Sequence, residues 1–355
     1  MKTVVTGAAG FIGSHVVDAL RKRGHDVIGI DSLDPGVHHG PPAYLRSDVD
    51  YCFADLRHWV PDERFNDTEA VVHLAALGGV ARASRERANI LQGNVGGTAR
   101  LAEAASGWPK LRKIVSVSSF SIYGSNYRYR CSSCGSEQDA SRRIEDLTAG
   151  RYEVLCRLCG AECRVLPITE ATASNPLETY GASKYMQELC FRGFGHCPVN
   201  IVRLSSVYGD RLRLDDGEAT IIAKLAGWIR SGVTPKLLED GRQLRDWVYV
   251  GDVVDSVLAL LHQDVHQPVI NICSGVGTTL LEACARLSEV IGVDCTPKVV
   301  GGFRPGDMRH CLGDPSLMRS LLRRDPIRFH DGAERAFQQV ALRCLQHSST
   351  ATRSH

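Results

Sequence analysis

The chain has 355 residues, 13 of them cysteines, and a formal net charge of +2. This length predicts one large domain with a smaller appended lobe. The small net charge argues against bulk nucleic-acid binding, which usually shows a strong basic excess. Because no secretory signal precedes the first apolar strand and no apolar run reaches about 18 residues, we expect a cytoplasmic protein without a transmembrane helix.

The first predicted elements are a strand, a glycine-rich turn, a helix and a second strand that ends at Asp31. The turn contains Gly7, Gly10 and Gly13 in the pattern G-x-x-G-x-x-G. Gly7 permits the tight turn, Gly10 lets the backbone approach a pyrophosphate, and Gly13 lets helix and strand pack closely. The helix N-terminus offers N–H groups to phosphate. Because an acidic residue after the second strand accepts hydrogen bonds from ribose hydroxyls and repels a 2′-phosphate, the pattern predicts NAD rather than NADP.

Further along the chain, two apolar runs at 70–76 and 113–119 predict strands. Helical patterns between the strands predict a parallel, doubly wound α/β sheet. The segment TYGASKYMQE then holds Tyr180 and Lys184, which share one face of a helix. A lysine ammonium, with a nicotinamide cation close by, lowers the pKa of the tyrosine, so that the phenol acts as a base near neutral pH. Ser119, at a strand end, is expected to hydrogen-bond the same substrate hydroxyl.

Two CxxCG motifs lie between the serine strand and the tyrosine helix, within residues 125–168. Their four cysteines are Cys131, Cys134, Cys156 and Cys159. In a reducing cytosol such a cluster favours metal binding over disulfides, which are the alternative. Four thiolates fill one tetrahedral zinc site and leave no open position for catalysis, so we predict a structural zinc ribbon that needs the metal to fold. Cys163 is either a free buried thiol or an alternate ligand. We expect the insertion to shape the pocket rim or a subunit contact.

Taken together, these motifs resemble those of the extended short-chain dehydrogenase/reductase family, the NAD-dependent nucleotide-sugar epimerases and dehydratases. The resemblance covers nearly the whole chain and rests on TGAAGFIG, HLAA, NVGGT, SSFSIYG, YGASK, VRLSSVYG, RDWVYVGDV and RPGDMR. It implies that Ser119, Tyr180 and Lys184 are the catalytic residues. The cofactor-binding residues that it implies are Gly7, Gly10, Phe11, Ile12, Gly13, Asp31, Asp55, Leu56, Leu74, Ala75, Ala76, Asn94, Tyr180 and Lys184.

The branch of the family follows from the residues after the catalytic serine. In the 4,6-dehydratases an Asp–Glu pair stands there, whereas this chain has Phe120 and Ser121, so dehydration is disfavoured. The CxxCG motifs and the stretch 238–253 resemble instead the zinc-ribbon-containing enzymes similar to dTDP-L-rhamnose 4-epimerases. This implies a 4-epimerase that acts through a 4-keto intermediate and regenerates NAD. The alternatives are a nucleotide-sugar oxidase or decarboxylase of the same family and a non-catalytic NAD-binding regulator, which would not need the intact trio.

The resemblance also implies a set of substrate-binding residues. They are Ser121, Ser206, Arg245, Arg304 and Asp307. Guanidinium forks suit phosphate oxygens, so the two arginines are expected to bind the diphosphate of a dTDP- or UDP-linked sugar. The chain has Ser206, Asp210 and Tyr249 where the family usually has Asn, Pro and His, which leaves the sugar open.

The expected domain boundaries follow the order of these motifs. They are 1–124 and 169–207 for the NAD-binding Rossmann domain, to which 246–265 returns, 125–168 for the zinc-ribbon insertion, 208–245 and 266–345 for a smaller nucleotide-sugar lobe, and 346–355 for a disordered tail. By analogy with the family, we expect a homodimer that pairs through two helices, one of which begins at Tyr180.

Overall fold

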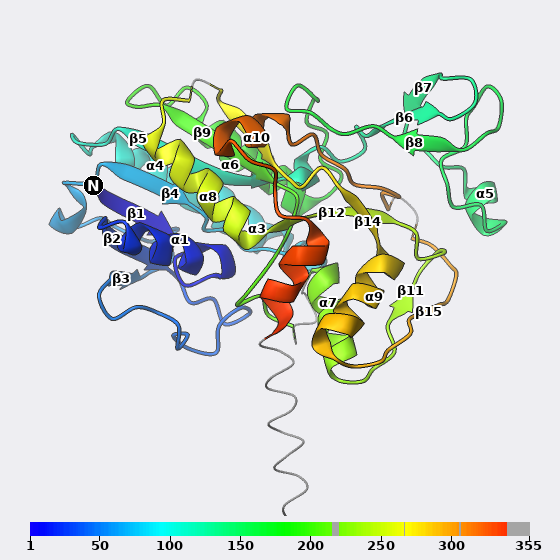
Figure 1. The fold of residues 1–355 in the computed structure, drawn as a ribbon. Helices are drawn as coiled ribbons and strands as arrows, with labels where there is room; N and C mark the ends of the chain where they lie inside the picture. The colour runs from blue at the N-terminus through cyan, green and yellow to red at the C-terminus, as the bar shows by residue number, and fades with distance from the viewer. Residues whose placement is uncertain (215–219, 266, 305–306, 339–355) are drawn as a thin grey trace, which may run out of the picture.

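A seven-stranded parallel sheet forms the centre of the computed structural model, which describes residues 1–214, 220–265, 267–304 and 307–338 (Figure 1). The strand order is β13-β9-β5-β4-β1-β2-β3. These strands are β1 (Lys2–Thr6), β2 (Asp26–Asp31), β3 (Asp50–Phe53), β4 (Ala70–His73), β5 (Lys113–Ser119), β9 (Val199–Leu204) and β13 (Val269–Ile272). The strand order reverses between β1 and β4, which is the switch point where doubly wound sheets bind ligands. The predicted parallel Rossmann-like sheet is confirmed.

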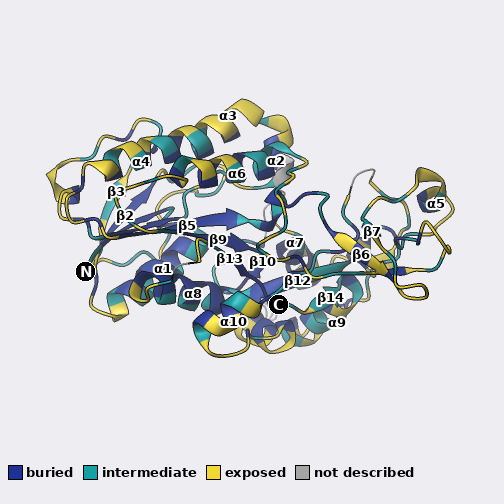
Figure 2. Cartoon of the chain, turned by 90° about the horizontal axis from the view of Figure 1, so that it is seen from above, coloured by how far each residue is buried: buried dark blue, intermediate teal, exposed yellow. Residues whose placement is uncertain are grey.

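Helices cover both faces of this sheet, as Figure 2 shows. One layer contains α1 (Phe11–Lys22), α8 (Val250–His262) and α10 (Ser316–Leu322), and the other contains α2 (Val80–Arg85), α3 (Arg87–Leu91), α4 (Gly97–Ser106) and α6 (Thr179–Phe191). Shorter turns are η1 (Glu63–Phe65), η2 (Gln92–Gly96) and η3 (Phe120–Ile122). Side chains alternate between the faces of a strand. On β1, Val5 therefore packs into the core under the first layer and Val4 into the core under the second.

A second lobe lies beside the carboxyl ends of the central strands (Figure 1). Its elements are β10 (Ser206–Tyr208), β11 (Lys236–Leu237), β12 (Leu244–Tyr249), β14 (Gly277–Thr279), β15 (Lys298–Val299), α7 (Ile221–Arg230) and α9 (Leu280–Ile291). β12 pairs in parallel with β10 and antiparallel with β14. Trp247, Ile222 and Leu287 belong to a separate apolar core that holds this lobe together. Thr279 and Glu282 form a capping box that starts α9.

The cysteine-rich insertion projects from the body of the molecule (Figure 1). It contains β6 (Arg128–Cys131), β7 (Glu137–Asp139), α5 (Ile144–Thr148) and β8 (Cys163–Val165). The three strands form a small antiparallel sheet with β6 in the middle. Tyr127 and Tyr129 are buried at its base in one cluster with Phe120, so the insertion packs against the main body at this end.

The chain passes between the second lobe and the central sheet more often than the predicted domain boundaries imply. Residues 266–345 are expected in the second lobe, but β13 is the outermost strand of the central sheet. The reason is that α8 belongs to the crossover between the neighbouring parallel strands β9 and β13, and such a connection returns the chain to the same sheet. The expected tail at 346–355 lies outside the described residues. Among the helices of the described ranges, none combines the length and the apolar character needed to cross a membrane.

Candidate active site

One large cavity, about 1550 Å³, opens between the carboxyl ends of the central strands and the second lobe. A pocket for one drug-sized ligand usually measures about 300–1000 Å³, so this cavity has room for more than one such ligand. The structure places every predicted cofactor, catalytic and substrate residue on its lining except Asn94.

The glycine-rich turn follows β1 and forms one wall of the cavity. Gly7 has a φ of +68°, a left-handed conformation that glycine adopts without strain. A Cβ on Gly13 would lie 1.9 Å from the carbonyl oxygen of Gly7, so the helix packs against the turn too closely for any side chain. The Asp31 carboxylate accepts hydrogen bonds from the backbone N–H groups of Ala9 and Leu33, both at 2.9 Å. Asp31 thereby ties the turn to the end of β2.

Asp55 and Leu56, after β3, line another part of the same cavity. The Arg57 guanidinium lies 2.6 Å from the Asp55 carboxylate, and its hydrogen bonds lower the pKa of that carboxyl. Arg57 also donates to Asn89 Oδ1 at 2.8 Å. Arg57 lines the cavity and is missed by our sequence analysis. The Asp-x-Arg spacing was a usable signal, because it lets the Arg57 backbone N–H donate to Asp55 Oδ1.

Asn94 is fully buried behind the cavity instead of lining it. Its Nδ2 donates to Ser183 Oγ at 2.9 Å, and the Ser183 hydroxyl donates to the Tyr180 carbonyl oxygen at 2.7 Å. Its Oδ1 accepts from the Leu77 N–H at 2.6 Å. Asn94 therefore fixes the first turn of α6 relative to the segment after β4.

The three predicted catalytic residues meet on the cavity wall: Ser119 ends β5, whereas Tyr180 and Lys184 lie on α6. The pKa of Tyr180 is not lowered in this structure as the sequence predicts: burial raises it to about 12, and Ser119, which hydrogen-bonds the phenol, offsets this rise only in part. The Glu178 side chain starts α6 by accepting from the N–H groups of Tyr180 and Gly181 at 2.6 and 2.7 Å. Gly181 is another residue that sequence reasoning missed, because only the fold shows that a Cβ there would lie 2.6 Å from the Ser121 carbonyl oxygen.

Lys184 is held in a buried polar network under the cavity. Its Nζ donates to the Val117 carbonyl oxygen at 2.6 Å and to Gln187 Oε1 at 2.5 Å. Gln187 Nε2 in turn donates to Thr98 Oγ1 at 2.6 Å, and His73 Nε2 lies 2.8 Å from the same hydroxyl. Burial lowers the pKa of Lys184 to about 8, and burial together with the Lys184 charge lowers that of His73 to about 3. At neutral pH the network therefore carries one positive charge, on Lys184.

Among the predicted substrate residues, Ser121 lies beside Ser119, to whose Oγ its hydroxyl donates at 3.0 Å, whereas Arg245, Arg304 and Asp307 line the cavity from the second lobe. Arg245, on β12, donates to the carbonyl oxygens of Leu244 and Arg309 at 2.8 and 3.0 Å. The adjacent Asp246 is buried and accepts from the N–H groups of Ser274 and Gly313 at 2.7 and 3.1 Å. These bonds fix the strand that carries Arg245.

The four predicted metal ligands form a compact cluster in the insertion. Cys131, Cys134, Cys156 and Cys159 place their sulfur atoms within 4.8 Å of one another. Individual Sγ···Sγ separations are 3.4, 3.6 and 3.7 Å, far longer than a disulfide bond of about 2.05 Å. Cys163 is buried nearby but is not a member of the cluster.

Comparisons with known proteins agree with this geometry. Residues 3–146 and 156–273 match the model of the NAD dependent epimerase/dehydratase family. The chain is 29% identical over 328 residues to a dTDP-L-rhamnose 4-epimerase of Burkholderia thailandensis, covering 89% of this chain and 88% of the relative. It is 30% identical over 335 residues to a UDP-glucose 4-epimerase of Mycolicibacterium smegmatis, covering 91% and 92%. The fold matches the UDP-glucuronic acid 4-epimerase of Bacillus cereus in complex with UDP-glucuronic acid and NAD, with a TM-score of 0.75, 25% identity and coverage of 96% and 99%. The chain therefore belongs to the NAD-dependent epimerase/dehydratase family, as its motifs predict.

Proposed function

We propose that this chain is an NAD-dependent nucleotide-sugar 4-epimerase. The observation that carries the proposal is that one cavity is lined by the glycine-rich turn, by Ser119, Tyr180 and Lys184, and by Arg245 and Arg304 of the second lobe. A dinucleotide, a reacting sugar and a diphosphate each have matching groups there. The 4-epimerase activity named for its relatives supports the reaction class.

The residues around the glycine-rich turn fit NAD. Because Gly7 and Gly13 carry no side chain, the turn packs closely against the start of α1 and against the segment after β4, and the N-terminus of α1 offers backbone N–H groups that suit a diphosphate. Asp31 has lone pairs beyond those that accept from the backbone, and these suit ribose hydroxyls, whereas its charge repels a 2′-phosphate. When bound, NAD would accept a hydride from carbon 4 of the sugar and return it to the other face of the same carbon.

The catalytic residues would move and hold one proton. The Tyr180 phenolate takes the proton from the carbon-4 hydroxyl as that carbon becomes a ketone, and gives it back when the ketone is reduced. Burial raises the pKa of Tyr180 to about 12, so forming the phenolate would require the Lys184 ammonium together with the nicotinamide cation of bound NAD, since opposite charges lower the pKa of a phenol. The Ser119 hydroxyl donates to the same substrate oxygen while negative charge develops on it. The cavity volume supports a turn of the ketone between the two half-reactions.

The cysteine cluster fits one structural zinc ion. A tetrahedron with Zn–S distances of about 2.3 Å has sulfur atoms about 3.8 Å apart, close to the separations of 3.4 to 3.7 Å between the cysteines. Gly135 and Gly160 follow the two Cys pairs with φ values of +74° and +75°, as the tight turns of a zinc knuckle require. Because four thiolates leave no open coordination position, the ion would stabilise the insertion and take no part in catalysis.

We also propose a homodimer that forms through α6. Leu177, Met186 and Leu189 lie on or just before this helix and are 56%, 43% and 40% exposed. Met186 and Leu189 are three residues apart and so share one face of α6, and exposed apolar side chains on one face support an interface there. Light scattering with size-exclusion chromatography measures the mass directly, and a monomer at micromolar concentration would reject the proposal.

A product assay without added nicotinamide tests the function. The purified protein is incubated with dTDP- and UDP-sugars that carry deuterium at carbon 4, and NMR follows the products. We expect sugars inverted at carbon 4 that keep the deuterium, because the same hydride returns to the same carbon. A ketone or a decarboxylated sugar formed only with added NAD would instead establish a net oxidase, and no turnover by a protein that binds NAD would favour a regulator.

A further inference from the structure

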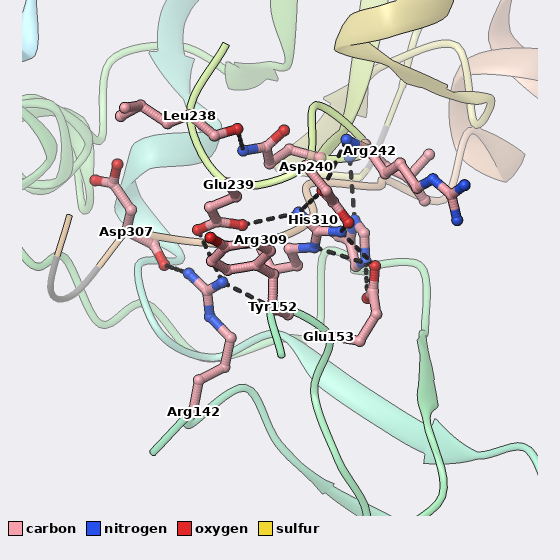
Figure 3. Close-up of polar contacts among 12 residues, drawn as sticks. Arg142, Tyr152, Glu153, Leu238, Glu239, Asp240, Arg242, Asp307, Arg309 and His310 are labelled. Atoms are coloured by element: carbon pink, nitrogen blue, oxygen red, sulfur yellow. Dashed lines mark hydrogen bonds and ion pairs between the residues drawn. The ribbon is translucent and has the colours of Figure 1, made fainter. Parts of the chain in front are cut away.

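A buried cluster of charged side chains joins the insertion to the second lobe (Figure 3). Arg142 belongs to the insertion, Glu239 follows β11, and Arg309 lies in the RPGDMR segment. The side chains of Arg142 and Glu239 are each 5% exposed, and that of Arg309 is completely buried. Arg142 Nη1 donates to Glu239 Oε1 at 2.9 Å, and Arg309 Nη1 donates to Glu239 Oε2 at 2.8 Å. The two arginines therefore share one carboxylate.

A second acidic residue, Glu153 of the insertion, binds Arg309. It accepts from Arg309 Nε at 3.2 Å and from His310 Nε2 at 2.9 Å. Asp240 completes the cluster by accepting two hydrogen bonds from Arg309, at 2.7 and 2.9 Å. Burial alone would raise the pKa of Glu153, but the hydrogen bonds from His310 and Arg309 outweigh it and lower this pKa to about 2. Glu153 is therefore ionised at neutral pH.

This cluster lies directly behind the part of the cavity that would hold the substrate. Glu239 and Asp307 both line the cavity. Arg142 Nη2 donates to the Asp307 carbonyl oxygen at 2.8 Å, and the Arg309 carbonyl oxygen accepts from Arg245 Nη1 at 3.0 Å. The insertion thus reaches Asp307 directly through Arg142. Glu153 reaches Arg245 through Arg309.

The conformation of Glu239 also indicates that the cluster holds the cavity wall. Its φ is +54°, a left-handed value that is strained for a residue with a side chain. The ion pairs with Arg142 and Arg309, together with the hydrogen bond from its N–H to the Gly302 carbonyl oxygen at 2.9 Å, keep it there. By contrast, the ion pair between Arg151 and Asp146 in the insertion is largely exposed at its arginine, which is 57% accessible. Exposed pairs of this kind contribute little.

From these contacts we infer that Arg142 and Glu153 are positioning residues of the nucleotide-sugar pocket. Through them the cysteine-bearing insertion sets the place of Asp307 and Arg245 in the cavity wall. The identity of the ligand rests on the proposed function, but the mechanical coupling between the insertion and the wall does not. The inference thereby chooses between the two roles predicted for the insertion and assigns it to the pocket rim.

Steady-state kinetics of Arg142→Met test this role. Because a small displacement of a binding group costs up to about 100-fold, we expect the KM for the nucleotide sugar to rise about 10- to 100-fold. The kcat should change less than about threefold, since Tyr180 and Lys184 lie on another element. Arg142→Lys should restore part of the KM, because an ammonium keeps a positive charge for Glu239 but lacks the second guanidinium nitrogen, which donates to the Asp307 carbonyl oxygen. Arg151→Met is the matched control and should keep the wild-type KM. A wild-type KM in folded Arg142→Met, or an equal rise in the control, would overturn the inference.

Hydrogen–deuterium exchange separates this inference from the proposed function because it needs no substrate. We expect the backbone N–H groups of 238–245 and 307–311 to exchange at least about tenfold faster in Arg142→Met than in the wild type. β6 and β8 should keep their protection, and Arg151→Met should match the wild type throughout. If the wild type turned over no nucleotide sugar, the proposed function would fail while this measurement still decided the coupling. Unchanged exchange in both segments would reject the coupling.

Discussion

Lys184 Nζ donates a hydrogen bond to the Val117 carbonyl oxygen at 2.6 Å, so the middle of α6 is anchored to the strand that carries Ser119. The ammonium is buried, and burial lowers its pKa from 10.5 to about 8. At neutral pH the folded protein therefore holds a buried positive charge, at a cost on the order of 3 kcal/mol. The catalytic role proposed for Lys184 explains why such a charge would be kept.

A dependence of stability on pH follows from this burial. Between pH 8 and 10.5 the unfolded chain binds more protons at Lys184 than the folded chain does, so the free energy of unfolding rises with pH. Relative to Lys184→Met, the wild type should gain up to about 3 kcal/mol between pH 7 and pH 10. Urea denaturation of both proteins at several pH values measures the difference. A difference that stays constant with pH would contradict a buried, titrating ammonium.

Removing the Tyr180 hydroxyl should lower kcat strongly while the affinity for a nucleoside diphosphate is kept. We expect Tyr180→Phe to lower kcat by about 10²- to 10⁴-fold, the usual contribution of a general base. Binding of a nucleoside diphosphate, measured by calorimetry, should remain within about twofold, since it does not depend on the proton transfer. Tyr185→Phe is the matched control, because Tyr185 lies on the same helix outside the cavity lining. Equal losses in both variants would point to damage of α6 instead of lost proton transfer.

The choice of cofactor should depend on Asp31. Its two carboxylate oxygens accept from the N–H groups of Ala9 and Leu33, and Asp31→Asn removes one acceptor and the negative charge. A hydrogen bond to a charged group contributes about 1.5–3 kcal/mol, so NAD affinity should fall at least about tenfold. The ratio of the affinities for NAD and NADP should fall, because the repulsion between Asp31 and a 2′-phosphate is lost. Calorimetric titration of both cofactors checks this, with Asp26→Asn at the exposed start of β2 as control. Equal affinity of the wild type for both cofactors would contradict the assignment.

Local patterns allowed the sheet and the cofactor turn to be predicted because their causes are local. The apolar run at 113–119 coincides with β5. The run at 70–76 overshoots, since β4 ends at His73. The reason is that the Leu74 N–H still donates to the Thr6 carbonyl oxygen at 3.2 Å, whereas the Ala75 N–H donates to Thr6 Oγ1 at 3.1 Å instead of continuing the strand. Such a side-chain acceptor on a neighbouring strand has no signature in the run itself.

The parts of the site that escaped prediction depend on residues far apart in the chain. Glu239 is 97 residues from Arg142, and the two meet only because this part of the insertion contacts the second lobe. A glutamate in a left-handed conformation also contradicts local propensity, and only the surrounding ion pairs make it understandable. Similarly, the spacing of Tyr180 and Lys184 predicts a shared helix face, whereas Gln187 beneath Lys184 becomes visible only with the fold.

Removing the metal from the cysteine cluster should weaken binding of the nucleotide sugar in the pocket. We expect one zinc ion per chain by elemental analysis, lost in Cys156→Ser and kept in Cys163→Ser, because Cys163 stands outside the cluster. Without the ion, the insertion should lose its protection from exchange, since so small a unit needs the metal to fold. The hydrogen bond from Arg142 of the insertion to Glu239 would then be lost, so the KM for the nucleotide sugar should rise as it does in Arg142→Met. If the metal acts through this contact, the two changes are not additive, and metal-free Arg142→Met should be no worse than the metal-free wild type. Additive losses would show that the ion affects the pocket by another route.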